Sequence, residues 1–128
     1  MSDQAGDPID ADVRVRKLVR QATQSFGDSI VPLGDSVWLE INGLHVILNS
    51  NRSQVFNPDL FVNMGIDPMS MQMLVVKSTN HFYGAFAPMA AEVIYCAVDG
   101  PYPNNPQTNN YVYLTRPIWP RVEKPHDA

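Results

Sequence analysis

The chain has 128 residues, of which 45% are hydrophobic and 17% are charged, which argues against a disordered chain and fits one globular domain. Its net charge of −4 and isoelectric point near 5.1 argue against a nucleic-acid partner. The single cysteine, Cys96, excludes a disulfide within the chain and favours a reducing, cytoplasmic compartment.

The ends of the chain are polar. Residues 1–11 do not resemble a signal peptide, and we expect them to be a disordered lead-in or a connector. Residues 12–120 are expected to form the folded domain and residues 121–128 a disordered tail. No apolar run approaches the roughly 20 residues that a membrane helix needs, so we expect no membrane partner.

The first predicted strand covers residues 13–19, where apolar and basic residues alternate. A helix over residues 16–24 is the alternative interpretation of the same segment. Turn signals follow at Phe26-Gly-Asp-Ser29 and Pro32-Leu-Gly-Asp35.

A β-hairpin is predicted over residues 36–50, because Asn42-Gly43 separates two runs of alternating apolar residues. A two-residue loop fixes the register, and all side chains of one face are then aliphatic. We expect this aliphatic face to point into the core. Its opposed pairs are Ile41 with Leu44, Leu39 with Val46, and Val37 with Leu48. The outer face is expected to carry Trp38 opposite Ile47.

Helices and buried strands are expected to alternate after the hairpin. Asn57-Pro58-Asp59 predicts a helix start and Gly65 its end. Residues 81–91 predict a second helix, broken by Pro88. Residues 73–76 and 93–98 are apolar runs typical of buried strands. The predicted fold class is α/β (mixed α+β): a mixed β-sheet with an N-terminal hairpin region and two or three short helices packed on it.

Motifs for self-sufficient catalysis are absent from the sequence. It contains no HExxH or CxxC zinc motif, no Gly-x-Ser-x-Gly elbow and no glycine-rich phosphate loop. Three histidines occur, His45, His81 and His126, and their spacing predicts no metal site in this chain.

Two polar segments are candidates for binding. Lys77-Ser-Thr-Asn-His-Phe82 follows a predicted strand and enters a predicted helix, a junction where open α/β sheets often bind ligands. Asn49-Ser-Asn-Arg-Ser-Gln54 leaves the hairpin before the Asn57 cap. The alternatives are a helix cap beside a solvated lysine for the first segment and an ordinary surface loop for the second.

At these segments the sequence resembles the C-terminal domain of the microcystinase C (MlrC) family of zinc metallopeptidases. The resemblance covers roughly residues 8–120, in the family's order. The matching segments are Gln24-Ser-Phe-Gly-Asp28, Pro32-Leu-Gly-Asp35, Val46-Ile-Leu-Asn-Ser-Asn-Arg-Ser-Gln54, Pro58-Asp-Leu-Phe61, Gly65-Ile-Asp-Pro68, Val75-Val-Lys-Ser-Thr-Asn-His-Phe82 and Arg116-Pro-Ile-Trp-Pro120. The loop at residues 100–110 departs from the family's pattern.

The resemblance implies part of a hydrolase that acts on small peptides of the microcystin type. It implies that zinc and the catalytic residues belong to an N-terminal domain, in cis or on a separate chain, so that this truncated chain carries no catalytic residue and no metal ligand. Six positions match the family's motifs and are expected to bind substrate: Arg52, Ser53, Gln54, Lys77, Ser78 and His81.

Two other interpretations remain open. One is a stand-alone binding or interaction module derived from the family. The other is a poorly folding relic that exposes a surface made for the missing domain, with Trp38, Ile47, Phe82, Tyr83 and Phe86 as the expected apolar patch.

Overall fold

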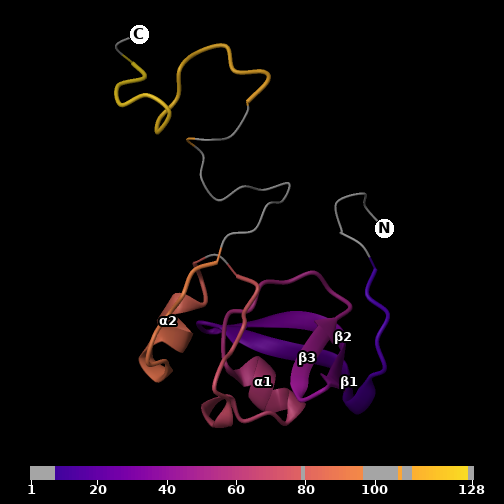
Figure 1. Ribbon diagram of the computed structural model, residues 1–128. Coiled ribbons are helices and arrows are strands. Elements are labelled where there is room, and N and C mark those ends of the chain that lie inside the picture. The colour runs from indigo at the N-terminus through magenta and orange to yellow at the C-terminus, as the bar shows by residue number, and fades with distance from the viewer. Residues whose placement is uncertain (1–7, 79, 97–106, 108–110, 127–128) are drawn as a thin grey trace. The chain divides into compact units, whose positions relative to one another are not determined.

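The computed structural model describes residues 8–78, 80–96, 107 and 111–126. The chain divides into a compact unit, Ile9–Val93, and a second unit formed by the residues before and after it. The assigned helices and strands all lie in Ile9–Val93 (Figure 1). They are the strands β1 (Arg14–Phe26), β2 (Ser29–Ile41) and β3 (Leu44–Asn49), the α-helices α1 (Asp59–Met64) and α2 (Tyr83–Phe86), and the 3₁₀ turns η1 (Pro68–Ser70) and η2 (Ala87–Met89).

The three strands form one sheet in the order β1-β2-β3, and both pairings are antiparallel. Residues 14–26 are a strand, so the helical alternative for residues 16–24 is wrong. The hairpin forms around Asn42 and Gly43, which both have positive φ. Its predicted register is confirmed, with Ile41 opposite Leu44. A sheet with short helices confirms the predicted fold class.

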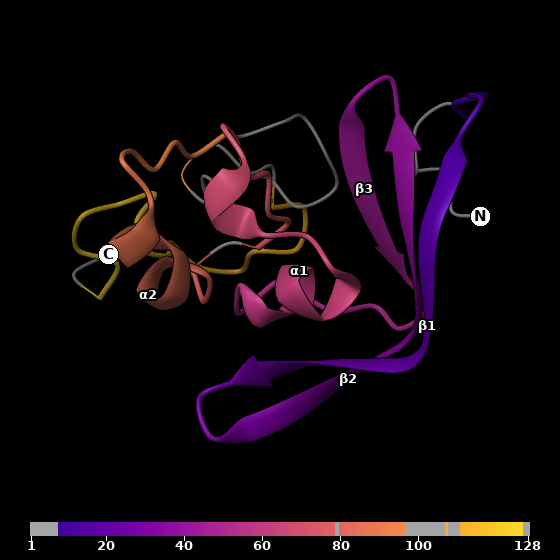
Figure 2. The same cartoon turned by 90° about the horizontal axis from the view of Figure 1, so that it is seen from below.

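The long β1–β2 ribbon bends sharply in its middle. Gln21 and Gly34 have φ of 50° and 70°, and the register of β1 shifts on both sides of Ala22. A side chain at position 34 would collide with the Ser50 hydroxyl, so the bend requires glycine for space as well as for its φ. Figure 2 shows the ribbon turning a corner, with α1 inside it.

Asp35 stabilises the bend through hydrogen bonds to β1 and to the segment that follows β3. Its carboxylate accepts a hydrogen bond from the Arg20 guanidinium and another, of 3.2 Å, from the Gln21 amide. These two donors lower the pKa of Asp35, the Arg20 side chain first. The Asp35 amide in turn donates to the Ser50 Oγ at 2.8 Å, which fixes the chain that leaves β3.

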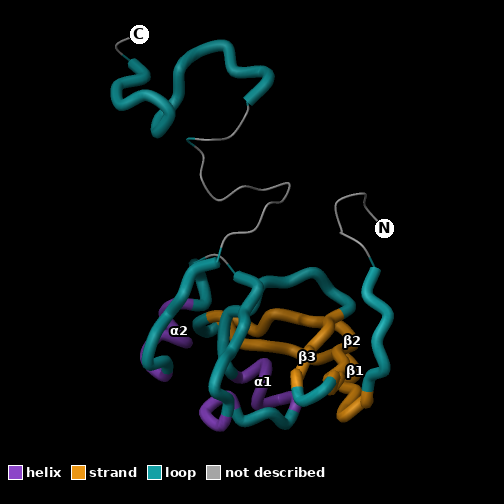
Figure 3. The backbone as a smooth tube through the Cα atoms, in the orientation of Figure 1, coloured by secondary structure: helices purple, strands orange, loops and turns teal. Residues whose placement is uncertain are grey.

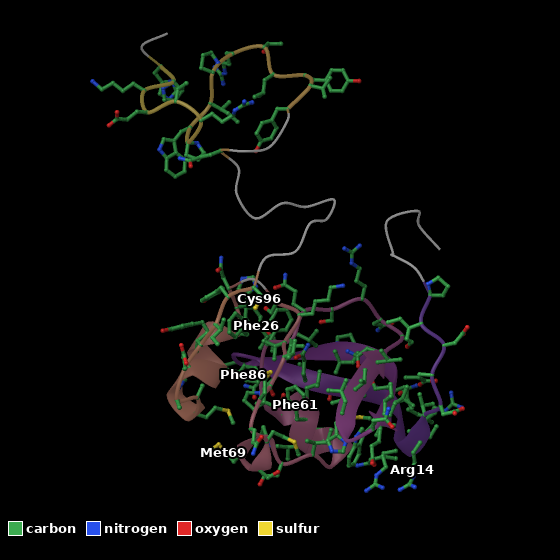
Figure 4. The ribbon with its side chains drawn as sticks, viewed as in Figure 1. Arg14, Phe26, Phe61, Met69, Phe86 and Cys96 are labelled. Carbon is green, nitrogen blue, oxygen red and sulfur yellow. The ribbon has the colours of Figure 1, made fainter. Side chains whose placement is uncertain are left out.

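The core lies in the corner between the bent ribbon and α1. Leu60 of α1 packs with the buried residues Ala22 and Leu33, and half-buried Val19 and Ile47 pack against them. The end of α1 is as predicted: Gly65 is in the left-handed conformation, and the Ile66 amide donates to the Phe61 carbonyl at 2.9 Å. Phe61 of α1 also contacts Phe86 of α2 edge to face, with 6.2 Å between the ring centroids (Figure 4).

The predicted facing of the hairpin is wrong. Ile47 packs against the core, whereas Leu44 and Leu48 of the expected core face are 63% and 52% exposed. The reason is the bend, which places α1 against the face that carries Trp38 and Ile47. The expected apolar patch is also wrong, because Phe82 and Phe86 are buried.

The predicted strands at residues 73–76 and 93–98 do not form in the described part of the chain. Residues 71–78 and 93–96 are loop, and Val75 and Ile94 are largely exposed. A strand needs a hydrogen-bonded neighbour, and neither segment pairs with β1 or β3. The sheet is therefore antiparallel rather than mixed within the described residues. The predicted helix at 81–91 is confirmed in shorter form as α2 and η2.

The second unit consists of loops and turns where the structure describes it (Figure 3). The Arg121 guanidinium lies 5.9 Å from the Tyr111 ring centroid. Cys96 is exposed. The loop at residues 100–110 lies outside the described residues except for Gln107. None of the described helices has the length and apolar character to cross a membrane.

Candidate substrate-binding cluster

A buried glutamine organises the loop that follows β3. Gln24, on the inward side of β1, is only 1% exposed. Its Nε2 donates to the Gln54 carbonyl at 2.7 Å and to Ser53 Oγ at 3.2 Å, and its Oε1 accepts from the Phe56 amide at 2.9 Å. One side-chain amide therefore satisfies three groups of the loop and fixes its path.

The two polar segments singled out in the sequence meet at this loop. Ser78 Oγ donates a hydrogen bond of 3.1 Å to Gln54 Oε1, although the two residues are 24 positions apart. The bond connects residues 49–54 with residues 77–82. Three of the six predicted site residues, Ser53, Gln54 and Ser78, therefore belong to one hydrogen-bonded group.

His81 joins the same group through aromatic contacts. Its ring lies edge to face against Phe26 and Phe56, with centroid distances of 5.3 and 5.8 Å. The two phenylalanine rings lie 4.5 Å apart. His81 is exposed, so its ring is held on one side while its nitrogens remain accessible to a ligand. We call these residues the Gln24 cluster: Gln24, Phe26, Ser53, Gln54, Phe56, Ser78 and His81.

Arg52 and Lys77 flank the Gln24 cluster in sequence but are not bonded into it. Both side chains are exposed, and neither makes a hydrogen bond or an ion pair with the described residues. Their charges are therefore available to an anionic group, the guanidinium as a fork and the ammonium as a point charge.

Asp59 is a further polar group beside the cluster. Its Oδ2 accepts from the Ser25 amide at 2.9 Å, next to Phe26 in β1. Its Oδ1 is buried and has no hydrogen-bond partner among the described residues.

Sequence reasoning missed Gln24, Phe26, Phe56 and Asp59. Gln24 and Phe26 both lie in the family-matching segment Gln24-Ser-Phe-Gly-Asp28. Gln24 also follows Ala22 at strand spacing, and a polar residue on an inward face must find internal partners. Nothing in the sequence linked Phe26 to Phe56, because they stand 30 positions apart and only the fold brings them to His81.

The described residues do not fit a zinc ion. Nowhere among them do three or more His, Cys, Asp or Glu side chains group closely enough to bind a metal. His45 Nδ1 accepts a hydrogen bond from Trp38 Nε1 at 3.1 Å, and His81 lies among phenylalanines. The Gln24 cluster contains neutral hydrogen-bonding groups and an imidazole, and Arg52 and Lys77 add two cations next to it in sequence. Groups of this kind can bind the amides and carboxylates of a ligand.

Comparison with known proteins identifies the family. A family profile described as "MlrC C-terminus" matches residues 1–112. The chain belongs to the MlrC C-terminal family. It is also 30% identical over 116 residues to the curated protein Microcystinase C of Sphingomonas sp, an alignment that covers 91% of this chain. The resemblance noted in the sequence is thereby confirmed.

This chain corresponds to a small part of that relative. The alignment covers 22% of Microcystinase C, so about four fifths of that protein has no counterpart in the 128 residues. Both segments that meet in the Gln24 cluster lie inside the family match.

Proposed function

We propose that this chain is the C-terminal, substrate-lining and structural domain of an MlrC-like zinc metallopeptidase that hydrolyses small peptides of the microcystin type. It is not catalytic alone. Zinc and the catalytic residues belong to an N-terminal partner domain, in cis or as a separate chain, that corresponds to the remaining four fifths of Microcystinase C.

The observation that carries the proposal is the hydrogen bond between Ser78 and Gln54. It joins the two polar segments of an MlrC C-terminal domain into one surface. Arg52, Lys77 and His81 are exposed beside groups that hydrogen bonds and ring contacts hold in place, as a binding surface requires.

Each group has a role that its chemistry allows. Arg52 and Lys77 bind carboxylates of an acidic peptide, and the guanidinium can do so through two parallel hydrogen bonds. Ser53, Gln54 and Ser78 hydrogen-bond to peptide amides. His81 donates or accepts a hydrogen bond at a ring nitrogen that faces the ligand. The metal, bound by the partner domain, would supply the activated water, while these residues hold the peptide in place.

The test uses the two-domain enzyme, with Lys77→Ala and His81→Ala made separately. Each change removes one contact to the bound peptide, so kcat/KM for a linear peptide substrate should fall about tenfold, equivalent to about 1.4 kcal/mol of lost transition-state stabilisation. Steady-state kinetics at several peptide concentrations would separate KM from kcat.

Arg14→Ala is the matched control. Arg14 is an exposed cation at the opposite end of β1 from Phe26 (Figure 4), and its removal should leave kcat/KM unchanged. Unchanged kcat/KM in both Lys77→Ala and His81→Ala would reject the substrate-lining role. If neither the same polypeptide nor the adjacent reading frame encodes a metallopeptidase domain, the binding-module alternative replaces the enzyme-part proposal.

A further inference from the structure

One face of the sheet is aliphatic, and α1 packs on the opposite face. The register puts Val15, Leu39 and Val46 in one row across the three strands, and Leu18, Val37 and Leu48 in the next. Ile41 and Leu44 complete it beside the hairpin turn. We call this surface the outer sheet face: Val15, Leu18, Val37, Leu39, Ile41, Leu44, Val46 and Leu48.

The outer sheet face has no charged residue in any of its rows. Arg14, Lys17 and Glu40 of the same strands occupy the other face, where Lys17 Nζ donates to the Asn63 carbonyl of α1 at 3.0 Å. The Arg20–Asp35 ion pair, two positions beyond Leu18 and Val37, ends the outer sheet face at the bend. A sheet that meets solvent on one side normally places its polar residues there. This sheet does the opposite, with its solvent-side residues aliphatic.

Half of the outer sheet face is exposed to solvent. Val15 and Leu18 are 61% and 56% exposed, and Leu44 and Leu48 are similarly open, whereas Val37, Leu39, Ile41 and Val46 are half-buried. Within Ile9–Val93, α1 covers only the opposite side, inside the corner of the ribbon (Figure 2). Contiguous apolar surface of this kind, left in contact with water, marks a site of association.

The family relationship indicates what covers it. In Microcystinase C about four fifths of the polypeptide lies outside the alignment, and the profile describes the matched part as the C-terminus, so the rest precedes it. A preceding polypeptide is connected through residues 1–13 to β1, the strand that contributes Val15 and Leu18 to the outer sheet face. The larger part of an MlrC-type protein is therefore tethered to a strand of this aliphatic surface.

We propose that the outer sheet face is the docking surface for the N-terminal part of an MlrC-family protein, which covers it with an apolar surface of its own. The proposal rests on the partner domain of the proposed function and assigns the surface that binds it. The partner's contacting residues must be aliphatic or aromatic, because a charge opposite this face would be buried without a counterion.

The test co-expresses the 128-residue chain with the N-terminal four fifths of Sphingomonas Microcystinase C and measures the dissociation constant of the purified pair. The unmodified chain should co-purify with this probe as a one-to-one complex. Leu18→Glu and Leu44→Glu each place a charge in the interface and should raise the dissociation constant about tenfold or more.

Ile30→Glu is the matched control. Ile30 also lies in β2 and is 67% exposed, but it pairs with Ser25 in the other half of the ribbon, outside the outer sheet face. It should bind as the unmodified chain does. All three variants should melt at the temperature of the unmodified chain, because each replaces a side chain already in solvent.

The proposal is overturned by any of three results: no complex with the probe, equal binding by all three variants, or a homodimer of the unmodified chain that Leu18→Glu dissociates. The melting temperatures of the variants without the probe give a further check. If Leu44→Glu lowers the melting temperature of the chain and Ile30→Glu does not, the outer sheet face is already covered within this chain and the proposal is overturned.

The two proposals fail separately. If Leu18→Glu leaves the dissociation constant of the complex unchanged but Lys77→Ala still lowers kcat/KM, the assigned docking surface is wrong and the proposed function stands. If Leu18→Glu dissociates the complex while Lys77→Ala and His81→Ala leave kcat/KM unchanged, the docking surface stands and the substrate-lining role is wrong.

Discussion

Gln24 illustrates how one side chain positions a candidate site. Its amide bonds to two backbone groups and one hydroxyl of the loop at residues 53–56, and the loop then presents Gln54 to Ser78. The sequence pointed to Ser53, Gln54, Ser78 and His81 because polar residues concentrate in two short segments. Their grouping around Gln24 could not be predicted, because no local pattern specifies a contact across 30 positions.

We expect Gln24→Ala to lower the free energy of unfolding by about 2–3 kcal/mol, because the Gln54 carbonyl and the Phe56 amide lose their buried partner. Urea denaturation of the isolated chain measures the effect. Gln72→Ala, at an exposed position, is the control and should change the free energy by less than about 0.5 kcal/mol. Equal stability of the two variants would mean that the loop does not depend on Gln24.

Among the secondary-structure elements, the bend in the β1–β2 ribbon decides the architecture. Without it, the two 13-residue strands would form a ribbon with one continuous inner face. With it, the ribbon folds around α1 and brings Leu33 of β2 to Leu60. The sequence contained the turn signal Pro32-Leu-Gly-Asp35, but the bend also needs the contact between Gly34 and Ser50, which is non-local.

The bend predicts a difference between two glycines of positive φ. Gly27→Ala has nothing within 4 Å of the added carbon and should cost about 1–2 kcal/mol, from the left-handed backbone alone. Gly34→Ala meets Ser50 as well and disrupts its bond to Asp35, so it should cost about 2–4 kcal/mol. Chemical denaturation of both variants gives the comparison.

The control for this pair is the double variant Gly34→Ala with Ser50→Ala, which removes the colliding hydroxyl. It should be less destabilised than the sum of its single changes, since the collision with the Ser50 hydroxyl is relieved and only the close contacts with the Asn51 side chain, at 3.0–3.1 Å, remain. Equal costs at Gly27 and Gly34 would show that backbone strain, not the contact with Ser50, governs the bend.

For the whole molecule, the main question is which side of the sheet forms the core. The aliphatic face of the hairpin looks like a core face by composition, yet the described core contains Ala22, Leu33 and Leu60 on the other side. Composition identifies a sheet face that needs an apolar surface to cover it. It does not say whether the covering surface belongs to the same chain, and here α1 reaches only one side.

Neighbouring residues of β3 test this arrangement. Ile47→Asp should destabilise the isolated chain by about 2 kcal/mol more than Leu48→Asp, because Ile47 packs on the core and Leu48 is open to solvent. Both changes carry the same cost of aspartate in a strand. The difference between their free energies of unfolding, measured by thermal or urea unfolding, therefore reports the burial of residue 47 relative to residue 48. The reverse order of stability would restore the hairpin facing first predicted from the sequence.

The sequence by itself determined the local structure: the hairpin register at Asn42-Gly43, the end of α1 at Gly65 and the family to which the chain belongs. These follow from patterns a few residues long, in which φ preferences and alternation act locally. Tertiary structure alone decided which sheet face is covered, whether residues 73–76 find a neighbouring strand, and how Gln24 joins two distant segments. Each depends on contacts between residues far apart in the chain, and for the outer sheet face we propose that the decisive contact is with another polypeptide.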